Sequence, residues 1–214
     1  GTNTSTYTGV ILPWYTPIPD LAYPDVTLFS RTKPYCSGTL LHNLDDARLD
    51  IYYKKFGIEK WSYTPLTRAE FLRIVLDFVE ADIALEKSLS GTRYYPDVSP
   101  RAWYRSYVNY ATRHGIVSGN NGYFSPNARV TRAEATKILI HALGEDGRPY
   151  ENSFIDVPKT HTLARFIQSA FEKCFLSGKN TRDGKVIGNA QGRIFDPEWG
   201  ITGPETLKIL YNMK

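Results

Sequence analysis

Residues 94–144 read YYPDVSPRAWYRSYVNYATRHGIVSGNNGYFSPNARVTRAEATKILIHALG, and two other stretches of the chain follow the same pattern. One is the shorter SYTPLTRAEFLRIVLDFVE at 62–80, and the other is a looser copy across 154–210. Repeats of roughly 50–70 residues are typical of arrays of similar units, because a single unit cannot bury its own apolar face. The sequence therefore predicts three related units, with binding surfaces in the grooves between them.

The pattern divides the 214 residues into a lead-in at 1–22 and units at 23–87, 88–147 and 148–214. The lead-in contains three prolines and no helical period, so we interpret it as extended. The Thr- and Ser-rich start at Gly1 is interpreted as the cut end of a longer precursor. No apolar run approaches the length of a membrane span, so none is predicted.

Each unit ends in a predicted helix that begins with a capping box, Ser/Thr-x-x-Glu, in which a hydroxyl and a carboxylate satisfy the first helical N–H groups. The boxes are Thr67–Glu70, Thr131–Glu134 and Thr202–Glu205. Apolar residues then follow at helical spacing. They are Phe71, Ile74, Val75, Phe78 and Val79; Ala135, Ile138, Leu139, Ala142 and Leu143; and Ile209, Leu210 and Met213.

We expect these three apolar faces to meet in a common centre. A second helix precedes each box helix, at about 44–56, 102–114 and 162–175, and the third unit carries an insertion at 179–191. Short strand-like pieces are expected only at 123–124 and 194–195. The predicted fold class is therefore all-α, built from three helix-loop-helix repeats around a central helical bundle.

The positive charge of the chain is concentrated in its middle. Residues 93–144 contain seven Lys and Arg against two Asp and Glu, a net charge of +5, whereas the whole chain carries +4. Such a patch favours an anionic partner by long-range attraction. An ordinary soluble surface with uneven charge remains the alternative.

Two arginines stand inside the capping boxes without being needed for the cap. Arg68 and Arg132 follow the box threonines, where a cation is mildly unfavourable because a helix N-terminus already carries partial positive charge. Beside free helix N–H groups, an arginine could bind a carboxylate or phosphate. It could equally pair with a structural Asp or Glu. The sequence leaves both interpretations open.

Asp97 and Trp103 form a second candidate pair, and Asp156 holds the place of Asp97 in the third unit. A carboxylate beside an aromatic ring suits a sugar, because the ring covers the apolar sugar face. The same residues could instead be a helix cap and a core side chain. In the loop that follows, Gly115 is placed to end a helix and Gly119 to supply a left-handed turn.

These motifs resemble the S-layer homology family: aromatic-x-Asp-Val, Trp, Gly-Ile-Val-x-Gly, Phe-x-Pro and Thr-Arg-Ala-Glu all occur in 94–144. The resemblance implies a pseudo-threefold, three-pronged assembly of three domains. It also implies an extracellular role at the bacterial cell surface, anchoring a protein to an acidic secondary cell-wall polysaccharide. The family's typical ligand bears pyruvate ketals on N-acetylmannosamine.

Carried over residue by residue, the resemblance assigns the best groove to Arg68 with Asp97, Trp103 and Gly119. A second groove would combine Arg132, Asp156 and Gly178, with Thr162 where the tryptophan would stand. The third would need Gly203 beside Asp25, and we expect it to be inactive because Gly203 has no side chain.

Other classes of function find less support in the sequence. The recurring glutamates are explained by capping, and no acid/base pair, metal-ligand spacing or phosphate loop is apparent, so neither an enzyme nor a cofactor is predicted. An extracellular protein–protein scaffold is the alternative function, and no nucleic-acid motif occurs. We expect a monomer. The two cysteines, Cys36 and Cys174, are interpreted as buried thiols, with a disulfide as the alternative.

Overall fold

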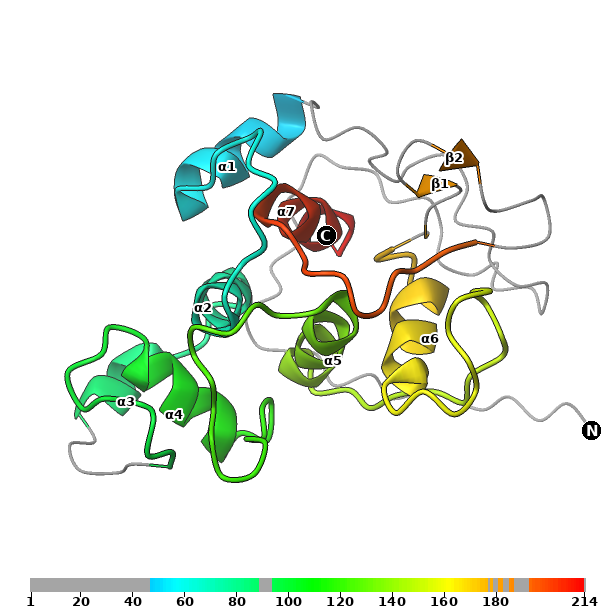
Figure 1. Ribbon diagram of the computed structural model, residues 1–214. Helices are drawn as coiled ribbons and strands as arrows, with labels where there is room; N and C mark the ends of the chain where they lie inside the picture. The colour runs from blue at the N-terminus through cyan, green and yellow to red at the C-terminus, as the bar shows by residue number, and fades with distance from the viewer. Residues whose placement is uncertain are drawn as a thin grey trace, which may run out of the picture. The chain divides into compact units, whose positions relative to one another are not determined.

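The computed structural model describes residues 47–88, 94–176, 178, 181–182, 185–186 and 193–213 (Figure 1). The chain divides into two compact units, 1–34 and 35–214, and every described residue lies in the second. The predicted lead-in at 1–22, together with Asp25 and Cys36, lies outside the described residues.

Within the described ranges the structure is mostly helical, which confirms the predicted fold class. The elements are η1 (Ala47–Leu49), α1 (Asp50–Phe56), α2 (Arg68–Phe78), α3 (Ile83–Ser88), α4 (Arg105–Arg113), α5 (Arg132–Ala142), α6 (Ala164–Glu172), β1 (Thr181–Arg182), β2 (Lys185–Val186) and α7 (Gly203–Asn212). Helix α3 was not predicted, because six residues are too few for a clear period. The antiparallel pair β1–β2 lies in the insertion, whereas Tyr123 forms only an isolated bridge with Asn120.

All three capping boxes form as predicted. The hydroxyls of Thr67, Thr131 and Thr202 accept the backbone N–H three residues on, at 3.3, 3.2 and 3.3 Å. The glutamate of each box accepts the threonine N–H in return, at 2.9–3.1 Å. Helices α2, α5 and α7 therefore begin at sites that the local sequence specifies.

The apolar faces of these three helices share one core, as expected. Phe71, Ile74, Ile138, Leu139 and Leu210 are buried in a single cluster. Each box helix also packs on the first helix of another unit: α2 on α4, α5 on α6, and α7 on α1 (Figure 1). The contacts run in a closed cycle, so no unit completes its own core. The three-pronged, threefold geometry remains a prediction.

Three backbone hydrogen bonds close a ring where the capping boxes meet. The N–H of Leu66 donates to the carbonyl of Ile201 at 2.9 Å, Val130 donates to Leu66 at 3.0 Å, and Ile201 donates to Val130 at 3.1 Å. Each of these residues directly precedes a box threonine, and Val130 and Ile201 are buried. The ring fixes the starts of α2, α5 and α7 relative to one another.

We expect Thr131→Ala to lower the free energy of unfolding by about 1 kcal/mol, because the Glu134 N–H loses its acceptor. Thr131→Ser keeps the hydroxyl and should retain most of that stability. Urea denaturation followed by circular dichroism measures both variants. Equal losses for Ala and Ser would show that the methyl group of the threonine, rather than the cap, stabilises this helix start.

Candidate ligand-binding site

The first turns of α2 and α5 dock on the Phe-x-Pro loop of the following unit. The N–H groups of Arg68 and Ala69 donate to the carbonyls of Ala128 and Pro126, at 2.9 and 3.1 Å. In α5, Arg132 and Ala133 donate in the same way to Trp199 at 2.8 Å and Pro197 at 3.0 Å. The free helix N–H groups that the anion-binding interpretation required are therefore already occupied.

Both box arginines bind groups of the next unit. Nε of Arg68 donates to the Phe124 carbonyl at 3.1 Å, and Nη1 pairs with Glu134 at 3.4 Å. Nε of Arg132 donates to the Phe195 carbonyl at 2.8 Å, and Nη1 pairs with Glu205 at 3.1 Å. Each guanidinium also lies 5.1 Å from the centre of that phenylalanine ring.

This geometry confirms the ion-pair interpretation of the arginines, and the partner in each case is the capping-box glutamate of the following unit. The Arg68 side chain is 13% exposed and that of Arg132 is 8% exposed. The two side chains are therefore parts of the fold, with Arg68 the more accessible of the two.

The third box helix, α7, has no arginine that could make the corresponding contact with the first unit. At the position of the arginine stands Gly203, where an added Cβ would lie 2.6 Å from Cγ2 of Ile58. Pro204 follows and has no N–H to donate. Within the described residues, Glu70 binds its own Thr67 and no arginine. The space in which an arginine would begin is thus filled by Ile58.

The two predicted site aspartates orient the loops that receive the arginines. Asp97 accepts the N–H groups of Phe124 at 3.0 Å and Ser125 at 2.6 Å. Asp156 accepts those of Phe195 at 2.8 Å and Asp196 at 2.7 Å.

Both loops contain a residue in the left-handed region, Ser125 and Asp196 at φ 58°, which these carboxylates help to hold. The alternative in which Asp97 caps the next helix is wrong. Helix α4 has Tyr104 as its N-cap, with no side-chain cap bond.

The predicted glycines have different roles in the structure. Gly119 is not left-handed; an added Cβ there would meet the Tyr95 ring and lie 2.8 Å from the Tyr123 carbonyl, so close packing requires it. This corrects the predicted left-handed turn. Gly115 does end α4 with φ 68°, as expected, and Gly178 is left-handed at φ 74° beside Phe154.

Trp103 lies at the surface, 55% exposed, so the core interpretation is wrong for it. The Arg73 guanidinium lies 5.9 Å from its ring centre. Beside it, the Tyr107 hydroxyl donates to Asp77 at 2.9 Å. Burial, followed by this hydrogen bond, raises the pKa of Tyr107 above its usual value. The structure thus brings Arg68, Asp97 and Gly119 to the Phe124 loop, and Trp103 to the middle of α2.

Sequence reasoning missed Arg73, Asp77 and Tyr107, which occupy the contact between α2 and α4. We call this contact and the adjoining 119–128 loop the α2–α4 junction. Its counterpart, the α5–α6 junction, comprises Arg132, Asp156, Gly178 and the 193–199 segment. The one available signal was the register of the box helices, in which Arg73 and Lys137 both stand six residues after the box threonine.

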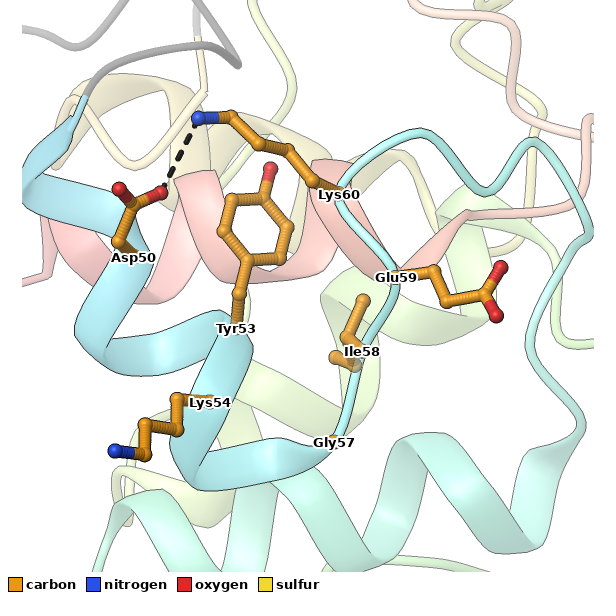
Figure 2. Close-up of a pocket in the computed structure, with 7 residues that line it drawn as sticks. All are labelled: Asp50, Tyr53, Lys54, Gly57, Ile58, Glu59 and Lys60. Atoms are coloured by element: carbon orange, nitrogen blue, oxygen red, sulfur yellow. Dashed lines mark hydrogen bonds and ion pairs between the residues drawn. The ribbon is translucent and has the colours of Figure 1, made fainter.

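A pocket of about 420 Å³ opens on the first unit, between α1 and the turn that follows it (Figure 2). Lys60 extends across it to Asp50 at 3.2 Å, while Glu59 points away from that pair. Its two lysines and two carboxylates balance, so the pocket has no evident preference for an anion. Its lining is Asp50, Tyr53, Lys54, Gly57, Ile58, Glu59 and Lys60.

Three further expectations can be compared with the structure. Cys174 is disulfide-bonded, so its interpretation as a thiol is wrong; the chain's other cysteine is Cys36. Among the described residues, no helix combines the length and apolarity needed to cross a bilayer. In that same part of the chain, no three His, Cys, Asp or Glu side chains gather where they could hold a metal ion.

Comparison with known proteins identifies a family domain in the middle of the chain. Residues 94–136 match the S-layer homology domain. The chain is 27% identical to the surface-layer 125 kDa protein of Lysinibacillus sphaericus over 58% of its length, and 32% identical to the middle cell wall protein of Brevibacillus brevis over 53%. An exoglucanase of Acetivibrio thermocellus is 30% identical over 40% of the chain.

The chain spans 11% of the two surface proteins and 8% of the exoglucanase. The matched domain contains Asp97, Trp103, Gly119 and Arg132. Together with the surface proteins among the relatives, it indicates an extracellular cell-surface location and a role in surface anchoring.

We expect Arg132→Met to be more destabilising than Arg68→Met, because Arg132 is more buried and closer to its glutamate. The loss at Arg132 should be on the order of 1.5–3 kcal/mol, the usual contribution of a hydrogen bond to a charged group. Urea denaturation of both variants, with Glu205→Gln and the Arg132→Met/Glu205→Gln double variant, gives the coupling energy. Additive single losses would show that this ion pair contributes nothing to stability.

Proposed function

We propose that this chain anchors a larger protein by binding an acidic cell-wall polysaccharide at the α2–α4 junction. The observation that supports this most directly is Trp103, an exposed indole inside the segment that matches the S-layer homology domain. Beside it lie the Arg73 guanidinium of α2 and the ring of Tyr107, whose hydroxyl donates to Asp77. An exposed ring with neighbouring polar groups suits a sugar, whose apolar face covers the ring while its hydroxyls bind the polar groups.

Arg68 is the proposed contact for an acidic substituent, such as the carboxylate of a pyruvate ketal. A guanidinium has five N–H donors. The contacts to Phe124 and Glu134 use Nε and one donor of Nη1. Donors therefore remain for a ligand carboxylate, which would share the guanidinium with Glu134. Asp97 and Gly119 act here through the loop that they shape.

The charge distribution favours the same ligand class. The junction draws on residues 93–144, which carry a net charge of +5, and a positive surface raises the local concentration of a polyanion. This attraction decreases with ionic strength, so binding at the junction should weaken as salt is added.

The α5–α6 junction is proposed as a weaker second site, formed by Arg132, Asp156 and Gly178. It repeats the arginine, aspartate and loop of the first junction. However, Arg132 is less exposed than Arg68, and Thr162 stands at the place of the indole. The ring that faces this junction, Phe166, is itself buried.

The relatives support anchoring over catalysis as the role of this segment. A surface-layer protein, a cell wall protein and an exoglucanase each match part of the chain, and each match covers only about a tenth of that protein. A segment that is common to proteins with such different names is better explained by a shared location than by a shared reaction.

The proposal is tested by sedimentation of the chain with protein-free cell-wall sacculi from the three bacteria named above, before and after chemical removal of the secondary polysaccharide. We expect binding to at least one untreated preparation and its loss after the polysaccharide is removed. Binding that survives removal would indicate attachment to peptidoglycan. Failure to bind any preparation would contradict the proposal and favour the protein–protein scaffold.

Variants separate the binding role of Arg68 from its structural role. We expect Arg68→Gln to weaken binding about ten- to a hundredfold through loss of a charged hydrogen bond. Glu134→Gln, which removes the same ion pair but keeps the arginine, should retain binding. Trp103→Ala should weaken binding, whereas Trp61→Ala, at a tryptophan 62% exposed outside both junctions, should not. Equal losses of binding in Arg68→Gln and Glu134→Gln would show that Arg68 supports the fold and does not contact the ligand.

A further inference from the structure

A cluster of four side chains occupies the middle of the α2–α4 junction, apart from the Phe124 loop. Arg73 and Asp77 come from α2, Tyr107 from α4, and Trp103 from the turn before α4. The cluster is continuous: Arg73 lies over Trp103, Trp103 meets Tyr107, and Tyr107 donates to Asp77.

Trp103 is held in a fixed orientation although it is exposed. Its ring meets Tyr104 edge-on at 5.2 Å between centres and Tyr107 edge-on at 6.4 Å. The Arg73 guanidinium lies over the ring at 5.9 Å from its centre. More than half of the residue nevertheless remains exposed to solvent, at 55%. A rigid, exposed ring suits stacking, because little rotamer freedom is lost when a ligand binds.

Arg73 is itself anchored from the opposite side. Its Nη2 donates to the carbonyl of Phe56, the last residue of α1, at 3.0 Å. The negative end of a helix dipole attracts a cation in this position. Among the described residues, its buried Nε has no hydrogen-bond partner. The contacts described for Arg73 are thus a helix end and the indole, whereas Arg68 pairs with a carboxylate.

The α5–α6 junction provides an internal comparison. Lys137 has the register of Arg73, and its Nζ lies 5.9 Å from the centre of the Phe166 ring. A cation over an aromatic ring of the next unit therefore occurs at both junctions. Only at the α2–α4 junction is the ring that the cation covers exposed, since Phe166 is buried.

We propose that Arg73 is a positioning residue of the α2–α4 junction, which holds the Trp103 indole in place for the sugar ring. This inference rests on the proposed polysaccharide binding. Arg68 and Arg73 are five residues apart on α2, about 7.5 Å along its axis and about 140° around it. The two arginines therefore have separate roles, with Arg73 acting on the indole and Arg68 proposed to bind the acidic group.

The test compares Arg73→Met, which keeps side-chain length without charge, with Arg73→Lys. A lysine at position 73 should still reach the ring, because Lys137 at the equivalent position of α5 lies over the Phe166 ring. Arg101→Met, at an exposed arginine of the same unit, controls for the loss of one positive charge. Binding is measured by titration with the polysaccharide released from the sacculi that bind the unmodified chain.

A second measurement needs no ligand. Acrylamide quenching of Trp103 fluorescence, with Trp14, Trp61 and Trp199 replaced by Phe, reports how firmly the indole is held. We expect Arg73→Met to increase quenching and to weaken polysaccharide binding about two- to fivefold, the usual range for an exposed cation–π contact. Arg73→Lys and Arg101→Met should stay close to the unmodified chain in both measurements.

The outcomes are distinguishable. If the unmodified chain binds the polysaccharide and Arg73→Met changes neither quenching nor affinity, the positioning role of Arg73 is refuted while the proposed function stands. Greater quenching with unchanged affinity would show that Arg73 holds the indole but that binding does not depend on it, which also overturns the positioning role. If the unmodified chain binds no polysaccharide, the proposed function and the positioning role fail together.

Discussion

The structure depends on how the first turn of each box helix satisfies its N–H groups, which have no partners within the helix. A capping box supplies acceptors for two of these donors, the N–H groups of its threonine and of its glutamate. In α2 and α5 the two donors between them bind carbonyls of the following unit's Phe-x-Pro loop. A local helix start is thereby also a contact between units. The ring of hydrogen bonds through Leu66, Val130 and Ile201 then links all three starts.

The third unit shows that the arginine and the loop belong together. Helix α7 begins with Gly203 and Pro204, so it lacks both the arginine and one of the donors. The turn after α1 correspondingly lacks a Phe-x-Pro sequence and presents Ile58 against Gly203. Donors and acceptors are thus missing at the same junction, where apolar contact replaces the polar docking.

The sequence predicted the features that depend on neighbouring residues. The capping boxes and apolar faces follow from spacings of three and four residues, so α2, α5 and α7 and their shared core were predictable. The partners of Arg68 and Arg132 lie 66 and 73 residues away in the sequence, and no local pattern indicates which glutamate each arginine meets. Asp97 acts across 27 residues. The exposure of Trp103 was ambiguous because the same residue type suits a core or a surface.

A structural role for the box arginines does not exclude a role in binding. A guanidinium that is already held by a carbonyl and a glutamate loses little further freedom when a carboxylate joins it, so the fold pre-organises the contact. This pre-organisation alone applies equally to Arg68 and Arg132. The junctions differ in what lies beside the arginine: an indole that is fixed and exposed at the first, and a threonine with a buried phenylalanine at the second. A preference for the first junction must therefore come from the aromatic ring and the residues that orient it.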